Sequence, residues 1–494
     1  MTEKTAMTFG TRRCVGALLP AVLLAACAIG PPYKAPETAL PTGFRSQITA
    51  SDAVSFADLP WWSVFQDARL QGLINDALAN NQDLKVAVAR IEEARALVGV
   101  AASQGKPQVG YETAVGGEKA LTVQQGGSAG TVVYGALSSL LNVAWEVDVW
   151  GRIRKETEAA KANVLAQEDV RRGVILTLVS DLAADYFRLI ELDRELSIAE
   201  ESARVYKSTL DLFTLRSDAG RDSKLPVQRA QAVYDSSTAD IEDIKRRIAE
   251  QENAISTLAG AYPRDIERGA PLTEQTVPET PLGTTTALLQ RRPDILEAEQ
   301  SMIGANAEVG AALANFFPKL GLSTFAGIQG VDVNGTLNGF GIWNFVLNAV
   351  GPIYSGGRLE ELYHQRQAYW DEAVAKYRQK VLVAFQETSN ALAQQQTLAP
   401  QRLALESQVS ALRKSSDLAM ARYRAGRASY FEVLEAEQQL FPAEDALAQT
   451  QRDQLVAVVN LYKALGGGWN TQVTDGADPV PALVEPQTKN MNGE

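Results

Sequence analysis

The spacing of apolar residues changes along this chain, from the period of helices to that of strands and back. From Ala68 to Gln104, apolar residues recur every three or four positions, as on one face of a helix. From Thr131 to Val149 the period falls to two, and the polar face includes Asn142 and Glu146. This predicts a helix followed by a strand longer than a soluble half-buried strand usually is.

A second segment, Phe340 to Ala349, has the same two-residue period, with Trp343 and Phe345 on one face and Asn344 and Asn348 on the other. We expect weaker partner strands at Gln108–Glu118 and Lys319–Gly330. That makes about four strands per chain, whereas a membrane barrel needs at least eight. A trimer would supply twelve, so the strand count predicts oligomerisation.

The chain contains an internal duplication with an offset of about 206 to 211 residues. The best matches pair Asn142 with Asn348, Gly151-Arg152-Ile153 with Gly357-Arg358-Leu359, and Ala219-Gly220-Arg221 with Ala425-Gly426-Arg427. Each copy is expected to contain a helix, a strand pair, a long helix, a turn and a further helix.

The predicted helices are too long for a compact domain. The helical pattern from Ile153 to Arg216 covers 64 residues, which is about 96 Å at the rise of an α-helix. From Leu359 to Leu440 the only internal breakers are Pro400 and Gly426. Helices of this length indicate a coiled coil or a bundle. A seam is expected at Leu176, Val179, Leu182, Tyr186, Leu189 and Leu192.

Composition argues against catalysis and against a nucleic-acid partner. The 494 residues include one histidine, His364, and two cysteines, Cys14 and Cys27, with a net charge of −12. A multi-histidine metal site and a four-cysteine zinc site are excluded within one chain, and no P-loop or GxSxG motif is present. We therefore expect that the protein is not an enzyme, and the lack of a dense basic patch disfavours nucleic acid.

The start of the chain has the pattern of a lipoprotein signal. Basic residues precede an apolar run from Val15 to Ala26, which is too short to span a bilayer. The run ends in Leu24-Ala25-Ala26-Cys27, which resembles a bacterial lipobox and predicts lipidation of Cys27. The alternative is a plain secretory signal with an incidental cysteine. Ala28, in place of aspartate, favours sorting to the outer membrane.

These patterns divide the chain into six expected segments. They are a signal peptide (1–26), a lipid-anchored tether (27–66), a first repeat (67–262, strands about 108–149), a linker (263–285), a second repeat (286–469, strands about 319–353) and a tail (470–494).

Several motifs, in order along nearly the whole mature chain, resemble those of the outer-membrane efflux protein family (TolC/OprM-like), specifically its NodT-type lipoprotein branch. They are Cys27 with Pro31–Pro36, Trp61-Trp62 with Phe65, Asn81-x-Asp83-Leu84, Trp145 to Arg152, Arg291 to Ile295, Pro352-Ile353 with Gly356 to Arg358, Tyr423 to Gly426, and Leu461 to Trp469. No single motif is decisive, but the set is highly specific.

The resemblance implies a mainly α-helical homotrimer with a twelve-stranded β-barrel in the outer membrane and a periplasmic α-helical barrel. It would be the duct of a tripartite efflux pump, and it would catalyse no reaction and use no cofactor and no metal. Its implied partners are outer-membrane lipid, a periplasmic adaptor and an inner-membrane transporter, most often of the resistance-nodulation-division class. The alternatives are a duct for protein or peptide secretion and a structural outer-membrane lipoprotein.

The resemblance also places a periplasmic gate at the helix–turn–helix tips. It implies that Phe431 narrows the tunnel beside Glu432 and Glu435, and it adds Tyr423 from the Tyr-x-x-Gly motif. The family commonly has aspartate at the two acidic positions. A solvated role for both glutamates is the alternative.

One further candidate comes from the duplication. Arg229 occupies the position of Glu435 in the other copy, so we expect it to pair with an acidic residue of a neighbouring tip. The family's basic partner near this turn is not matched cleanly, because Ala428 occupies one candidate position.

Overall fold

The computed structural model describes residues 29–36, 40–45, 55–123, 129–278, 280, 285–333 and 336–467. Cys27, the signal segment before it and Trp469 lie outside these residues. The long elements are α3 (Ala68–Asn80), α4 (Gln82–Ser103), β1 (Gln108–Val123), β2 (Ala129–Val147), α5 (Arg152–Asp218), α6 (Lys224–Leu258), α8 (Pro293–Ala314), β3 (Lys319–Val333), β4 (Thr336–Val350), α9 (Arg358–Arg424) and α10 (Tyr430–Ala464). The short helices are η1 (Phe56–Asp58), α2 (Trp61–Val64), η2 (Leu272–Glu274) and α7 (Thr285–Arg291).

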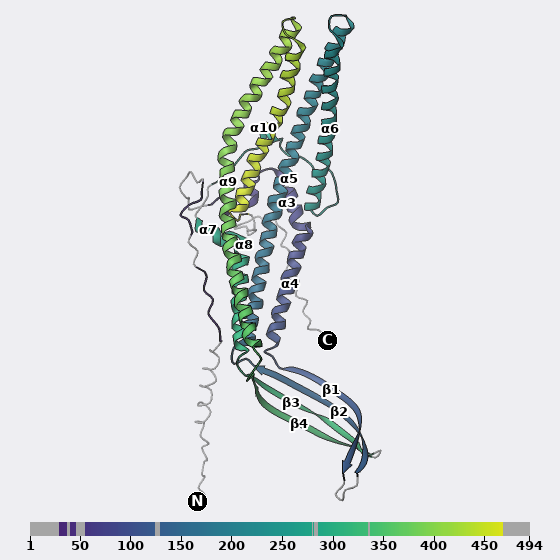
Figure 1. The fold of residues 1–494 in the computed structure, drawn as a ribbon, viewed down its shortest axis with the longest axis vertical. Coiled ribbons are helices and arrows are strands. Elements are labelled where there is room, and N and C mark those ends of the chain that lie inside the picture. The colour runs from purple at the N-terminus through teal and green to yellow at the C-terminus, as the bar shows by residue number, and fades with distance from the viewer. Residues whose placement is uncertain are drawn as a thin grey trace, which may run out of the picture. The chain divides into compact units, whose positions relative to one another are not determined.

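The four strands form one antiparallel sheet in the order β1-β2-β3-β4 (Figure 1). Its register places Tyr111, Leu141, Ala326 and Trp343 in one row across the sheet. The next row is Gly110, Asn142, Phe325 and Asn344, whose side chains point to the opposite face because successive residues alternate. The alternation predicted from the sequence is therefore present in the paired sheet.

Both repeats place a glycine opposite an asparagine in this sheet. A Cβ added to Gly110 would lie 2.5 Å from Oδ1 of Asn142, and one added to Gly321 would lie 2.5 Å from Oδ1 of Asn348. The asparagine side chain fills the space that any other residue would need. The duplication thus preserves a specific close contact as well as the overall pattern.

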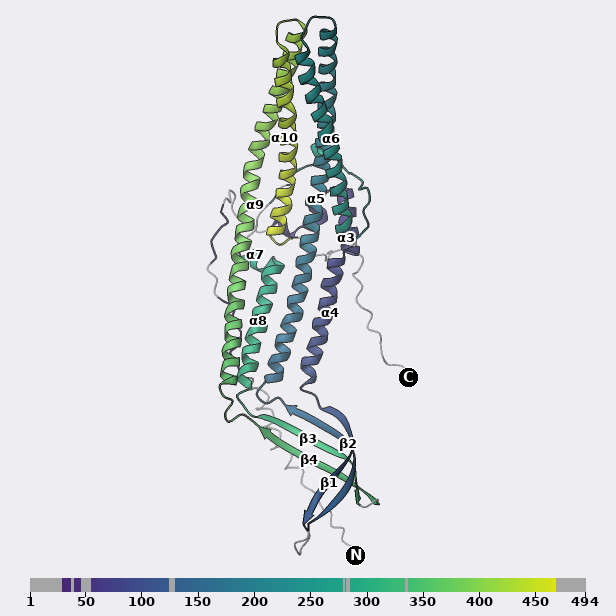
Figure 2. The same ribbon diagram turned by 45° about the vertical axis from the view of Figure 1, so that its right-hand side comes forward.

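The long helices form two antiparallel hairpins, α5 with α6 and α9 with α10, one from each repeat (Figures 1 and 2). α5 and α9 each have 67 residues, and α6 and α10 each have 35. Pro400 lies inside α9 and does not end it, whereas the helix ends two residues before Gly426. The helix predicted from Ala68 to Gln104 is two helices, divided at Asn81. No helix in the described part of the chain is both long and apolar enough to cross a membrane.

The structure separates into two compact units. The described residues of the first unit fall within 1–37, 90–167 and 297–377, and they include the sheet. Here the extended segment before the helices is fixed by specific contacts. The N–H of Ile29 donates to the carbonyl of Trp150 at 3.0 Å, and the hydroxyl of Tyr33 donates to Glu299 at 3.3 Å. Tyr33 also packs edge-on against Trp370.

The described residues of the second unit fall within 38–89, 168–296 and 378–494, and they form a large apolar core. The predicted seam residues from Leu176 to Leu192 are all buried. Within this core, α5 packs with α3 and with the C-terminal part of α10, whose Tyr462 is fully buried. The second unit also contains both helix–turn–helix tips.

Candidate functional site: the two helical tips

Each hairpin turns through one glycine in the left-handed region. Gly220 has φ +68° and Gly426 has φ +71°, a conformation that costs other residues about 1 kcal/mol or more. The N–H of Arg221 donates to the carbonyl of Arg216, and that of Arg427 donates to Arg422, which closes both helix ends in the same way. The duplicated Ala-Gly-Arg sequence therefore builds two equivalent turns.

A small apolar core stabilises the paired tips. It consists of Leu210, Phe213, Ala230, Tyr423 and Val433, which come from both hairpins. The ring of Tyr423 packs edge-on against Phe213, with centroids 5.3 Å apart. The two tips of one chain are therefore packed together (Figure 2).

One carboxylate joins the two hairpins. The hydroxyl of Tyr423 on α9 donates to Oδ2 of Asp222 at 3.1 Å, and Nε of Arg216 donates to the same oxygen at 2.7 Å. The guanidinium of Arg216 also lies 4.7 Å from the centre of the Tyr423 ring. Burial and the hydrogen bond to Asp222 raise the pKa of Tyr423 to about 12, so its hydroxyl keeps its proton and remains a donor near neutral pH.

The residues predicted to line an aperture are on the outside of these tips. Phe431 is 54% exposed, and Glu432, Glu435 and Arg229 are also exposed. Glu432 has a local role as well, because its carboxylate accepts the N–H of Ser429 at 3.2 Å and caps the start of α10. Of the five predicted site residues in this region, only Tyr423 forms a hydrogen bond between the two hairpins within the described residues.

The sequence reasoning missed Asp222 and Arg216. Asp222 follows the duplicated Ala-Gly-Arg turn directly, but its counterpart in the second copy is Ala428, so the duplication gave no signal for it. Only the family's Tyr-x-x-Gly motif predicts Tyr423 as a site residue.

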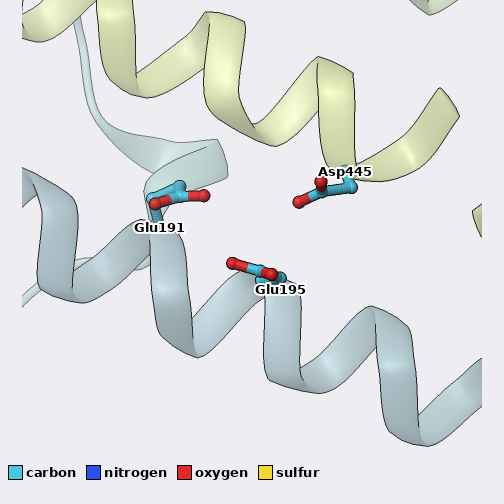
Figure 3. Close-up of side chains that lie close together, drawn as sticks. All are labelled: Glu191, Glu195 and Asp445. Carbon is cyan, nitrogen blue, oxygen red and sulfur yellow. The ribbon is translucent and has the colours of Figure 1, made fainter. Parts of the chain in front are cut away.

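Further from the tips, the contact between α5 and α10 contains buried acids. Glu437 is 4% exposed and accepts a hydrogen bond from the Thr209 hydroxyl at 2.9 Å. One group of described carboxylates is close enough to surround a cation. It consists of Glu191, Glu195 and Asp445, with one oxygen of each within 4.8 Å of the others (Figure 3).

The chain is similar to proteins of known families. Residues 73–261 and 285–467 match the family described as outer membrane efflux protein, in two segments that follow the two repeats. The chain is 31% identical to the cation efflux system protein CusC of Escherichia coli K12, over 91% of this chain and 99% of that protein. It is 32% identical to the antibiotic efflux pump outer membrane protein ArpC of Pseudomonas putida, over 94% and 97%.

Solved structures give the same result. The outer-membrane channel OprN is similar with a TM-score of 0.79 and 29% identity, over 90% of this chain and all of that one. The open state of the Neisseria gonorrhoeae MtrE outer membrane channel is similar with a TM-score of 0.75 and 29% identity, over 90% and 99%. The predicted fold class, helical units with four strands per chain, is confirmed.

Proposed function

Because this chain belongs to the outer membrane efflux protein family, whose members are channels and not enzymes, we propose that it is the passive, tip-gated exit duct of a tripartite pump for small molecules. In this proposal the protein conducts substrates that a periplasmic adaptor and an inner-membrane transporter, of the resistance-nodulation-division class, deliver to it. The relatives are named for cations and for antibiotics, which supports a duct that is permissive toward its cargo.

The observation that carries the proposal is the open four-stranded sheet. Both β1 and β4 are edge strands, with 16 and 15 residues. Apolar side chains on them are well exposed in the single chain, among them Tyr111 at 85% and Trp343 at 77%. Long apolar edges of this kind need a partner strand. Three copies, each pairing β4 with β1 of the next, would bury every edge in one twelve-stranded barrel.

We place the lipid anchor on Cys27. The first described residue, Ile29, is hydrogen-bonded to Trp150 just beyond the end of β2. Trp150 stacks on Phe317 at 4.9 Å, and aromatic pairs of this kind are frequent at the level of lipid headgroups. An acylated Cys27 two residues earlier in the chain would be close to the bilayer surface.

We place the gate at the hairpin tips. In this proposal the Tyr423–Asp222 bond keeps the two hairpins of each chain together, which narrows the periplasmic end. Phe431 and Glu435 lie one helical turn apart, and both are exposed, as pore-lining residues of a trimer would need to be before assembly. Arg229 would pair with an acidic residue of the next chain's tip.

The test has two parts. Native mass spectrometry of the purified protein should give a trimer, and this trimer should conduct ions in a planar bilayer. The Phe431→Ala Glu435→Ala variant should conduct more than wild type, and Arg229→Ala should as well. A monomer without conductance would refute the duct, whereas equal conductances would remove the named residues from the gate.

A further inference from the structure

Two groups of buried or partly buried carboxyl groups lie along the contact between α5 and α10, which we call the α5–α10 seam. The first is Glu437 with Thr209 and Tyr206, and the second is Glu191, Glu195 and Asp445 with their neighbours. Because α5 comes from the first repeat and α10 from the second, the seam joins the two hairpins of one chain. Ionisation of a carboxyl group in this seam therefore changes the stability of the contact between the hairpins.

Glu437 is buried and has no positively charged partner among the described residues. Within the same part of the chain, its two oxygens receive only the Thr209 hydroxyl, at 2.9 and 3.3 Å, while the Tyr206 hydroxyl donates to its backbone carbonyl. A buried carboxylate with one neutral donor is costly, whereas the protonated acid is not. Burial, only partly offset by the Thr209 bond, raises the pKa of Glu437 to about 7.

The other charged groups around Glu437 do not favour its ionised form. A cavity of about 400 Å³ between α5, α9 and α10 borders Glu437, and it gives protons a route to the site. Its charged lining residues are Glu201 on α5, Arg413, Asp417 and Arg424 on α9, and Glu444 on α10, while Asp240 on α6 acts on Tyr206. Arg413 is already paired with the buried Glu444, so the surroundings of Glu437 are acidic overall.

The second group leaves three buried oxygens without a donor. Glu191 is fully buried, and Oε1 of Glu191, Oε2 of Glu195 and Oδ1 of Asp445 have no hydrogen-bond partner in the described part of the chain. Figure 3 shows the three side chains directed toward one another across the seam. Such oxygens need either a cation or a proton between them, because a buried acceptor without a donor is costly.

The charge balance of this group favours a proton. Arg188 on α5 binds Glu191, Arg247 on α6 binds Glu195, and Arg452 on α10 contacts both Glu191 and Asp453, while Gln449 donates to Asp445. Four carboxylates thus face three guanidinium groups, which leaves one negative charge. One proton makes the group neutral, whereas a divalent cation would leave it positive. Burial, against the opposing effect of Arg188 and Arg452, raises the pKa of Glu191 to about 7.

We propose that the α5–α10 seam is a proton-dependent latch, closed while Glu437 and the Glu191 group hold protons and loosened when they ionise. A carboxyl group with a raised pKa in the closed state contributes to closure at low pH and loses that contribution as pH rises. For Glu437 the contribution to closure begins to fall near pH 4.5, and most of the fall is complete about one pH unit above 7. From pH 6 to pH 8.5, the opening equilibrium should rise about tenfold if opening exposes Glu437 fully. The effect of the latch on conduction rests on the proposed tip gating, but the latch itself does not.

Hydrogen–deuterium exchange of the purified full-length protein tests this. Amides of residues 200–213 and 433–446 are compared at pH 6 and pH 8.5, with labelling times scaled for the intrinsic rates. In wild type, the opening equilibrium constant, calculated after correction for the intrinsic exchange rates, should increase up to about tenfold at the higher pH. Glu437→Gln mimics the protonated acid, so it should remove most of that increase. Glu191→Gln should reduce it at 185–200 and 440–452.

Glu444→Gln is the matched control. Glu444 is as buried as Glu437 and lies on the same helix, but it is paired with Arg413, so its replacement should raise exchange equally at both pH values. The latch is refuted if wild type and Glu437→Gln show the same pH dependence. It is also refuted if millimolar Ca²⁺ slows exchange in wild type at pH 8.5 but not in Glu191→Gln, because the group would then be a cation site. Exchange does not require conduction, so a protein that fails to conduct would refute the proposed function and leave this test intact.

Discussion

Replacing Tyr423 by phenylalanine isolates the bond between the two hairpins. The change removes one hydroxyl and keeps the ring, which is 4% exposed and packs against Phe213. Asp222 retains its second partner, Arg216, at 2.7 Å, so no buried acceptor is left unpaired. The variant should therefore fold normally and differ mainly in how strongly the tips hold together.

The size of the effect follows from the type of bond. A hydrogen bond to a charged acceptor contributes about 1.5–3 kcal/mol, and the remaining Arg216 partner points to the lower end of that range. A loss of about 1.5 kcal/mol shifts the closed-to-open equilibrium of one tip pair by roughly tenfold. If the three chains of a trimer open together, the shifts multiply to the order of a thousandfold.

Single-channel recording in planar bilayers measures this directly, as the fraction of time spent in the higher-conductance state. The matched control is Tyr430→Phe. Tyr430 also packs on Phe213, at 5.9 Å, but its hydroxyl makes no hydrogen bond within the described residues. Tyr423→Phe should raise the open fraction, whereas Tyr430→Phe should not. If both variants match wild type, or both open equally, the Tyr423–Asp222 bond does not hold the gate.

Three further outcomes are expected. Cys27→Ser should abolish incorporation of a palmitate analogue, and labelling that persists would refute lipidation at this residue. Gly321→Ala should lower the yield of folded protein because its Cβ would meet Oδ1 of Asn348 at 2.5 Å, and adding Asn348→Ala should restore the yield if this clash is the cause. Gly426→Ala, at φ +71°, should destabilise its turn by about 1 kcal/mol, measured as faster proteolysis between α9 and α10. Ala425→Gly is the control, because it changes the neighbouring residue and leaves the left-handed position to glycine.

Most of the fold could be predicted because its signals are local and repeated. The strands β2 and β4 have strong alternation, and the duplication supports each half with the other. β1 extends to Val123, beyond the predicted Glu118, because its last residues are ordered by pairing with β2 and not by their own pattern. Asn81 divides a predicted helix in two because its side chain accepts the N–H of Leu84 and donates to the carbonyl of Leu258, a distant contact that periodicity does not contain.

The site could be predicted only in part. Family motifs located the tips and Tyr423, but the partners of Tyr423 depend on how the first hairpin packs against the second. Asp222 lies 201 positions from Tyr423, and Glu437 lies 228 positions from Thr209. No local pattern brings such residues together. The buried acids along α10 are equally hidden, because Glu437 and the exposed Glu435 look alike in the sequence.

The duplication also explains why the Tyr–Asp bond can form from the second hairpin to the first but not from the first to the second. At the offset of the repeat, Tyr423 corresponds to Ser217 and Asp222 corresponds to Ala428. The reverse pairing, from the first hairpin to the second, would bring a serine to an alanine and could not form the same bond. In a ring of six hairpins, therefore, the Tyr–Asp bond would occur within each chain but not between chains. Exchanging the residues, as Ser217→Tyr with Ala428→Asp, should add the missing links and lower the open fraction. An unchanged open fraction would mean that the contacts between chains do not resemble those within one.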